Sequence, residues 1–318
     1  MDRTLRAGLV QLCSGDDPAA NLAVTEALVR EAAGGGATLV LTPECTNLVS
    51  ADRALQAATF VTEAEDPTLA RLRVVAAELG IWLLIGGLGL RTGGVDGGAD
   101  GGAGGDGTED GDGGGRFANR SLLVAPDGSV AARYDKIHMF DVALAGGESY
   151  RESAAFRPGT RAVVAQAGPA RLGLSICYDL RFAQLYRALA QAGAEILAVP
   201  SAFTVRTGEA HWQTLLRARA IETGAFVLAP AQTGLHAARA GAPRRTWGHS
   251  LAVSPWGEVI ADAGAAVGAT LVDLDLGAVA RARAQVPSLR HDRAFSLPGE
   301  PAEGVAAGDA PASARDSG

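Results

Sequence analysis

The sequence has few cysteines, few aromatic residues and no long hydrophobic run. It holds 3 cysteines among 318 residues, Cys13, Cys45 and Cys177. An odd number of widely spaced cysteines argues against a disulfide framework and indicates a reduced, cytoplasmic protein. The longest apolar run, IWLLIGGLGL at 81–90, is far too short to cross a bilayer. Charges interrupt the first apolar run at the N-terminus, so we expect neither a secretory signal nor membrane association.

Most of the chain also lacks an excess of one charge sign, although the formal net charge is −7. Residues 93–115 contain six acidic residues and no basic one, and residues 299–318 add a net charge of −3. The remainder is nearly neutral, so nucleic acid is not indicated as a partner. The 5 histidines show no paired ligand spacing, which predicts no metal site.

What the sequence does have is an alternation of strand-like and helix-like segments. Apolar alternation and buried runs predict strands at 5–12 and 37–44, while helical apolar spacing predicts helices at 18–33 and 69–80. With 47% hydrophobic residues, the chain can bury a large core. The pattern predicts a mixed α/β fold in which helices cover sheets.

A low-complexity Gly/Asp segment at 93–115 interrupts this pattern between two predicted strands. Its GAGGDG stretch at 102–107 formally matches a dinucleotide-binding fingerprint, but no strand leads directly into it and no helix follows. Ordering so many glycines costs more backbone entropy than the other side chains offset, so we expect a disordered insert. We likewise expect one domain at 1–298 and a disordered tail at 299–318.

The segment RLGLSICYDLRF, residues 171–182, makes Cys177 a candidate nucleophile. Its first half alternates like a strand, and a helix is expected to begin soon after Tyr178. A cysteine at that point faces free backbone amides and the positive pole of a helix, which favours the reactive thiolate. Glu44 and Lys136 each follow a predicted strand, and they supply a base and a cation for an oxyanion. Taken singly, each of the three has an ordinary structural explanation.

Together, these residues resemble the carbon–nitrogen hydrolases of the nitrilase superfamily, and within it the branch of Nit-type amidases. The resemblance covers about residues 4–297 apart from the Gly/Asp insert. The order and spacing of the motifs make it specific. The motifs are LTPEC around Glu44, YDKIHMFD around Lys136, RESAAFRPG around Glu152, LSICYDLRF around Cys177, VPSAFTVRTGEAHWQTLLRARAIE at 199–222, APAQTG at 229–234 and WGHSLAVSPWGEV at 247–259.

The resemblance implies a four-layer α-β-β-α sandwich and a catalytic triad on Glu44, Lys136 and Cys177. A second glutamate of the family falls on Glu152, although Glu148 is a nearby alternative. The family also implies a homodimer that pairs through helices near the nucleophile, here within about 180–192 and 209–223.

The implied reaction is hydrolysis of the C–N bond of a small carboxylated linear amide to an acid and ammonia, through a cysteine thioester and without a cofactor. The branch implies substrates such as ω-amides of dicarboxylic acids or deaminated glutathione. Arg181 is either a carboxylate clamp or a surface arginine, and the Tyr178 amide is a candidate oxyanion donor. Phe203 and Trp212 either wall the pocket or belong to the core.

Other activities remain open at this point. A nitrilase, a ureido-acid amidohydrolase or a thioester-forming acyltransferase fits the same superfamily. Tyr178 and Asp179 stand where true nitrilases tend to carry tryptophan and glutamate, which favours amides over nitriles. A serine hydrolase acting through Ser175 is disfavoured because the last position of its nucleophile elbow needs glycine and holds Cys177.

Overall fold

The structure is a computed structural model that describes residues 3–92, 116–143, 149–239 and 243–293. The predicted disorder of the Gly/Asp insert at 93–115 and of the tail at 299–318 concerns residues outside these ranges, as does the alternative supporting residue Glu148.

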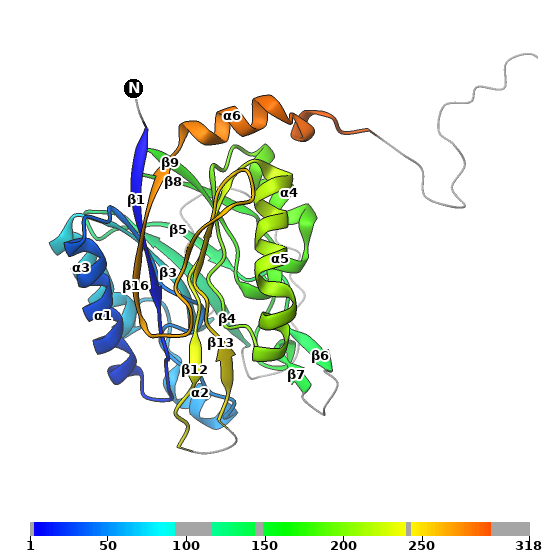
Figure 1. The fold of residues 1–318 in the computed structure, drawn as a ribbon. Helices are drawn as coiled ribbons and strands as arrows, with labels where there is room; N and C mark the ends of the chain where they lie inside the picture. The colour runs from blue at the N-terminus through cyan, green and yellow to red at the C-terminus, as the bar shows by residue number, and fades with distance from the viewer. Residues whose placement is uncertain (1–2, 93–115, 144–148, 240–242, 294–318) are drawn as a thin grey trace, which may run out of the picture.

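Two six-stranded sheets form the centre of the fold (Figure 1). The first runs in the order β16 (Gly268–Asp275), β1 (Thr4–Gln11), β2 (Leu39–Leu41), β3 (Trp82–Arg91), β4 (Phe117–Val124), β5 (Val130–Asp135). The second runs in the order β15 (Val259–Asp262), β14 (Leu251–Val253), β11 (Phe226–Ala229), β10 (Ile196–Ala198), β9 (Ala170–Leu174), β8 (Val163–Ala167). In each sheet three central strands pair in parallel, β1-β2-β3 and β9-β10-β11, and antiparallel strands flank them.

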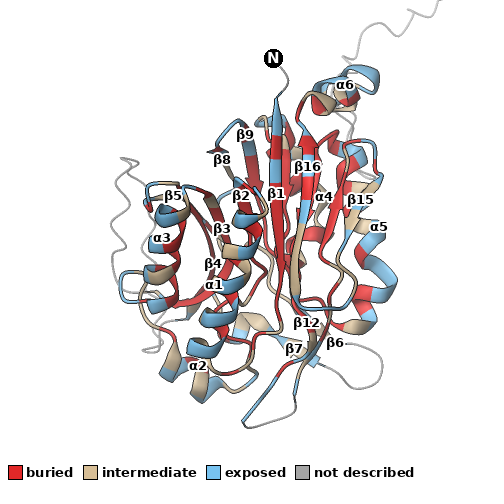
Figure 2. Ribbon diagram, turned by 60° about the vertical axis from the view of Figure 1, so that its left-hand side comes forward, coloured by how far each residue is buried: buried red, intermediate tan, exposed pale blue. Residues whose placement is uncertain are grey.

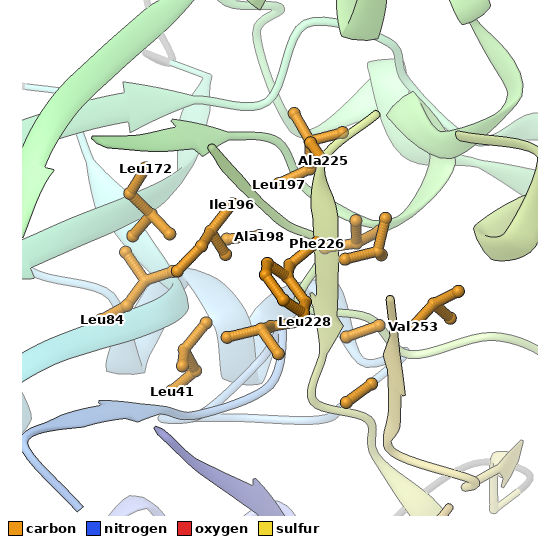
Figure 3. Packing of buried hydrophobic residues seen from close by; sticks show 14 of the residues in the cluster. Leu41, Leu84, Leu172, Ile196, Leu197, Ala198, Ala225, Phe226, Leu228 and Val253 are labelled. Atoms are coloured by element: carbon orange, nitrogen blue, oxygen red, sulfur yellow. The ribbon is translucent and has the colours of Figure 1, made fainter. Parts of the chain in front are cut away.

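The sheets pack face to face and helices cover their outer faces. Leu41 and Leu84 of the first sheet pack with Leu172, Ile196 and Leu228 of the second (Figure 3). Helices α1 (Pro18–Gly34) and α3 (Pro67–Leu79) lie on the outside of the first sheet, and α4 (Ala183–Gln191) and α5 (Val205–Thr223) lie on the outside of the second. The buried faces of the helices point toward the sheets and their exposed faces point outward (Figure 2). The predicted four-layer α-β-β-α sandwich is confirmed.

Local sequence signals set the ends of the helices on the first sheet. Asp17 and Asp66 cap α1 and α3 by accepting hydrogen bonds from backbone N–H groups of the first turn, and a proline follows each. Gly80 ends α3 with a φ of 64°, a left-handed conformation that favours glycine. The helices predicted at 18–33 and 69–80 are therefore found close to their expected bounds.

Smaller elements gather at one end of the sandwich, where β6, β7, β12, β13 and α2 lie together in Figure 1. They are α2 (Arg53–Thr59), the pair β6 (Asp141–Ala143) and β7 (Ser149–Arg151), and the pair β12 (Thr233–Leu235) and β13 (Arg245–Trp247). Short helical turns η1 (Glu152–Ala154) and η2 (Cys177–Arg181) complete this end, while α6 (Gly277–Gln285) and η3 (Ser288–Arg290) follow β16.

Gly86 on β3 lets the chain that carries Glu44 approach the sheet closely. A Cβ atom at this position would lie 2.0 Å from the carbonyl oxygen of Thr42 and 2.4 Å from Cβ of Pro200. Thr42 belongs to the segment between β2 and Glu44, and Pro200 follows β10 of the second sheet. The absence of a side chain at Gly86 therefore fixes how closely the two sheets approach beside the site.

The Gly86→Ala variant should lose about 2–4 kcal/mol of unfolding free energy, because backbone atoms rather than a flexible side chain occupy the space of the new methyl group. Urea unfolding measures this loss. Gly34→Ala is the matched control: no atom lies within 4 Å of its added Cβ, and it ends a helix. Equal unfolding free energies of Gly86→Ala and Gly34→Ala would contradict the close approach of Thr42 and Pro200 to Gly86.

The strands β3 and β4 are paired up to the ends of the Gly/Asp insert. Arg91 pairs with Phe117, and Thr92 Oγ1 donates to the carbonyl of Arg116 at 2.7 Å. A short turn can therefore join the two strands.

Replacing residues 94–114 with a short turn should leave the melting temperature and the activity nearly unchanged, since loop closure changes by only about 0.6 kcal/mol for each doubling of loop length. Differential scanning calorimetry and an activity assay on the same preparation measure both quantities. A large loss of activity would show that the insert takes part in function.

Candidate active site

Glu44, Lys136 and Cys177 meet beyond the carboxyl ends of three strands. Glu44 follows β2, Lys136 follows β5, and Cys177 opens η2 after β9. Lys136 Nζ donates to Glu44 Oε1 at 2.8 Å, and the Cys177 thiol is hydrogen-bonded to Glu44. The side chains of Lys136 and Glu44 are only 2% and 5% exposed. The structure thus places the three sequence-predicted residues in one buried cluster.

A second carboxylate shares the Lys136 ammonium. Glu152, in η1, accepts from Lys136 Nζ at 3.0 Å through Oε1 and at 2.8 Å through Oε2. The backbone N–H of Phe140 also donates to Glu152 Oε2 at 2.7 Å. Glu152 is therefore fixed against Lys136 from two directions.

Asn119 on β4 is a site residue that the sequence did not identify. Its Nδ2 atom donates to Glu44 Oε1 at 2.9 Å and lies 3.4 Å from Glu152 Oε1. The only signal in the sequence was a polar amide within the mostly apolar strand FANRSLLV. Asn119 links the two carboxylates and helps to keep both turned toward Lys136.

The backbone at Cys177 is strained and is held by buried contacts. Its φ of 50° lies in the left-handed region, which costs a non-glycine residue about 1–3 kcal/mol. The Cys177 N–H donates to the carbonyl of Pro200 at 2.9 Å. The fully buried Asp179 accepts from the N–H of Ile176 at 2.9 Å and from the Tyr134 hydroxyl at 2.6 Å. These contacts aim the thiol into the site.

The thiolate predicted from a helix pole is wrong for the resting site. Cys177 opens the short turn η2, and the longer helix α4 begins only at Ala183. Burial and the negative charge of Glu44 raise the pKa of the Cys177 thiol, and they outweigh the Lys136 ammonium, which lowers it. Sequence does not show how deeply a residue is buried. The expected lowering of the Cys177 pKa by a helix N-terminus is therefore outweighed by burial.

The two partners of Cys177 remain charged. Burial acts to raise the pKa of Glu44, but the Lys136 charge and hydrogen bonds from Cys177 and Lys136 bring it below its ordinary value. Burial acts to lower the pKa of Lys136, but Glu152 and Glu44 raise it well above its ordinary value. At neutral pH the cluster therefore holds a carboxylate, an ammonium and a neutral thiol, which suits general-base activation of the sulfur.

A cavity of about 290 Å³ contains the cluster in its wall. Phe203 lines this cavity, whereas Trp212 packs behind it with the ring centroids 4.8 Å apart. Trp212 is buried, and its Nε1 donates to the carbonyl of His249 at 2.8 Å. Of the two alternatives left by the sequence, Phe203 is a cavity wall and Trp212 belongs to the core.

The comparisons with known proteins agree with this geometry. A family model described as carbon-nitrogen hydrolase matches residues 6–284. The chain belongs to the carbon-nitrogen hydrolase family. The resemblance seen in the sequence motifs is thereby confirmed.

Among curated relatives of this carbon-nitrogen hydrolase is a deaminated glutathione amidase of Yersinia enterocolitica, 39% identical over 92% of this chain and 95% of that protein. Another is omega-amidase NIT2 of Homo sapiens, 33% identical over 91% of this chain and 95% of that protein. A similar solved structure is the NitFhit protein of C. elegans, with a TM-score of 0.76 and 32% identity. That match covers 91% of this chain and 65% of the NitFhit chain.

Arg181 of this carbon-nitrogen hydrolase lines the cavity and is held by aromatic rings. Its guanidinium lies 5.7 Å from the centroid of Tyr178 and 5.6 Å from that of Phe203. Two of its nitrogens lie 3.4 Å from Nδ1 of His211. The structure therefore places Arg181 in the cavity wall.

Two other cysteines lie outside the cluster of Glu44, Lys136 and Cys177. Cys45 lines the cavity with a φ of 58°, and burial together with the Glu44 charge raises the pKa of its thiol to about 12. Burial also raises the pKa of Cys13, whose Sγ donates to the carbonyl of Leu235 at 3.4 Å. The Glu44 and Lys136 charges act on Cys45 as well, but neither Cys45 nor Cys13 shares the hydrogen bond that joins Cys177 to Glu44.

Two kinds of feature are absent from the described part of the chain. There, no three His, Cys, Asp or Glu side chains gather closely enough to hold a metal ion. Among the same residues, no helix combines the length and the apolar character needed to cross a membrane.

The Glu44→Gln variant should lower the pKa of the Cys177 thiol, because it removes a negative charge that raises this pKa and leaves the Lys136 ammonium that lowers it. Alkylation by iodoacetamide as a function of pH, followed on the Cys177 peptide by mass spectrometry, measures the shift. The reaction should reach half its plateau rate at a lower pH than in the unmodified enzyme. Glu65→Gln, at an exposed glutamate, is the control. An unchanged or raised pKa would contradict the assigned charges.

Proposed function

We propose that this carbon-nitrogen hydrolase cleaves small linear amides that carry a carboxylate, through a thioester on Cys177. The observation that carries the proposal is the hydrogen-bonded set of Cys177, Glu44 and Lys136 in the wall of one cavity. The names of two relatives, a deaminated glutathione amidase and an omega-amidase, support the amide class.

Acylation begins with Glu44 accepting the thiol proton while the sulfur of Cys177 forms a bond to the amide carbon. The carbonyl oxygen becomes an oxyanion, which the Lys136 ammonium and the backbone N–H of Tyr178 stabilise. Tyr178 is the second residue of η2, where backbone N–H groups have no partner within the helical turn. Glu44 then donates its proton to the nitrogen, the C–N bond breaks, and ammonia or an amine leaves.

Deacylation uses the same carboxylate. Glu44 accepts a proton from water as the water oxygen bonds to the thioester carbon. The C–S bond breaks, the acid leaves, and Glu44 returns the proton to the sulfur of Cys177. Glu152 acts through Lys136, because its two contacts to Nζ keep the ammonium charged and in place throughout the cycle.

Arg181 is proposed as the group that binds the substrate carboxylate. A guanidinium binds a carboxylate through two hydrogen bonds, and Arg181 belongs to the same short turn as the nucleophile. A carboxylated amide bound there has its acyl portion next to Cys177. The dicarboxylic ω-amides are the class that this arrangement fits.

We further propose how the chain is organised into domains, how it forms a dimer and where it is located. One hydrolase domain spans 1–298, and two copies pair through α4 and α5. Ile221 on α5 is 56% exposed and Trp256 is 55% exposed, and Gly257, next to Trp256, lies against Ile221, so adjoining exposed apolar residues support such a face. Three free cysteines support a reducing, cytoplasmic location.

An ammonia-release assay tests the reaction over succinamate, α-ketoglutaramate, ureido acids and matched nitriles, with deaminated glutathione followed by release of its amine. The enzyme should release ammonia from a carboxylated amide without an added acceptor, and faster than from the matched nitrile. Cys177→Ala should lower kcat by at least about 10³-fold, because nucleophile removal leaves only binding and oxyanion stabilisation.

Cys13→Ala and Cys45→Ala should keep at least part of the activity, and Glu44→Gln should fold normally and be inactive. Substantial turnover by Cys177→Ala would refute the thioester mechanism. Faster hydrolysis of the nitrile than of the matched amide would show that the enzyme is a nitrilase and not an amidase. Product formation that requires an added amine would instead indicate an acyltransferase.

A further inference from the structure

A second cavity, of about 790 Å³, lies at the end of the sandwich opposite to Cys177. Its walls come from the amino ends of β1, β9 and β10 and from α6, which Figure 1 shows at the end of the molecule away from β6 and β12. Arg171 lies at the amino end of β9 and Cys177 follows its carboxyl end, so about 20 Å of extended chain separates them. The two cavities share no lining residue and are distinct.

Positive charge dominates the lining of this second cavity. Four arginines and one glutamate are its charged residues, namely Arg3, Arg171, Arg283, Arg290 and Glu195. Their formal charge is +3, whereas that of the whole chain is −7. The arginines come from the segment before β1, from β9, from α6 and from η3. The fold therefore gathers positive charge here from distant parts of the sequence.

The one carboxylate of the cavity is already paired. Arg3 donates to Glu195 through Nη1 at 2.8 Å and through Nη2 at 3.0 Å, one bond to each carboxylate oxygen. The backbone N–H of Arg171 donates to Glu195 Oε2 at 3.2 Å. Glu195 thus neutralises Arg3. In the described part of the chain, the other three guanidinium groups of the cavity have no carboxylate partner.

Arg283, on α6, is the most enclosed of these three. Its Nε donates to the carbonyl of Thr223 at 2.9 Å, and its Nη2 donates to the carbonyl of Ala194 at 2.6 Å. Burial lowers the pKa of Arg283 and outweighs the Glu195 charge, which raises it. A guanidinium that has lost water without gaining an ion-pair partner is stabilised by an anion that binds beside it.

Arg171 and Arg290 are exposed and keep their donors free. Within the described ranges, the side chains of both take part in no hydrogen bond or ion pair. The Arg171 guanidinium lies against the backbone of Gly193, where an added Cβ would be 2.5 Å from Nη1. Each of these guanidinium groups can give two parallel hydrogen bonds to one phosphate group.

We propose that this cavity binds a small molecule that carries two or more phosphate groups. Guanidinium groups on β9, α6 and η3 offer three separate contacts, which suits charges on successive phosphates better than the single charge of one carboxylate. The cavity volume lies within the range of small-ligand sites. Binding there does not depend on the amide reaction proposed for Cys177.

Isothermal titration calorimetry of the full chain with inorganic tripolyphosphate, at low ionic strength, tests the site. The unmodified protein should bind tripolyphosphate with a Kd below about 1 mM. Arg171→Gln and Arg290→Gln should each raise this Kd about 5- to 10-fold, because each removes a charge-assisted contact from a partly exposed site. Arg161→Gln is the matched control: it removes the same charge at an exposed position outside both cavities and should leave the Kd unchanged.

No saturable binding by the unmodified protein, or an unchanged Kd in both Arg171→Gln and Arg290→Gln, would overturn the proposal. Arg181→Gln should leave the Kd unchanged, since Arg181 lines the catalytic cavity. A loss of affinity in Arg181→Gln without one in Arg171→Gln would place the anion in that cavity and refute the second site. Citrate, a polyanion without phosphate, should bind more weakly than tripolyphosphate, and equal or tighter binding of citrate would overturn the phosphate class.

Discussion

The contact on which the site depends is one buried ammonium held between two carboxylates. Removing Lys136 from water costs several kcal/mol, so the charge is tolerable only where Glu44 and Glu152 both reach it. These partners lie 92 and 16 residues from Lys136 in the sequence, and Asn119 joins them. The cluster therefore forms only when β2, β4, β5 and η1 are all in place, which couples the charge pattern of the site to the folding of the first sheet.

The sandwich also maintains strained backbone at Cys45 and Cys177. Cys45 and Cys177 both have left-handed φ values, and each such residue costs about 1–3 kcal/mol. Buried contacts offset this cost. Gln232 donates to the carbonyls of Glu44 and Cys45, while Asp179 accepts from the backbone N–H before Cys177. Hydrogen bonds from the second half of the chain thus hold the turns that place Glu44 and the Cys177 thiol next to each other.

Helices, strands and motif residues depend on local sequence pattern and were predicted. Contacts between residues that lie far apart in the sequence were missed. Apolar spacing located the helices of the first sheet, and motif order located the cluster around Cys177. Asn119 was missed because its partners Glu44 and Glu152 lie far from it in the sequence. The thiolate was expected at Cys177 because sequence does not show how deeply a residue is buried, and burial raises the pKa of this thiol.

A neutral thiol beside a carboxylate suits an amide better than a preformed thiolate does. The nitrogen of an amide is a poor leaving group until it is protonated, so acylation needs a proton as well as a nucleophile. In the proposed mechanism the proton that Glu44 takes from Cys177 is the one that it delivers to nitrogen. A thiolate whose proton had left for solvent would leave Glu44 with no proton to deliver to the nitrogen. The burial that raises the pKa of Cys177 therefore keeps the proton available for the leaving group until the substrate is bound.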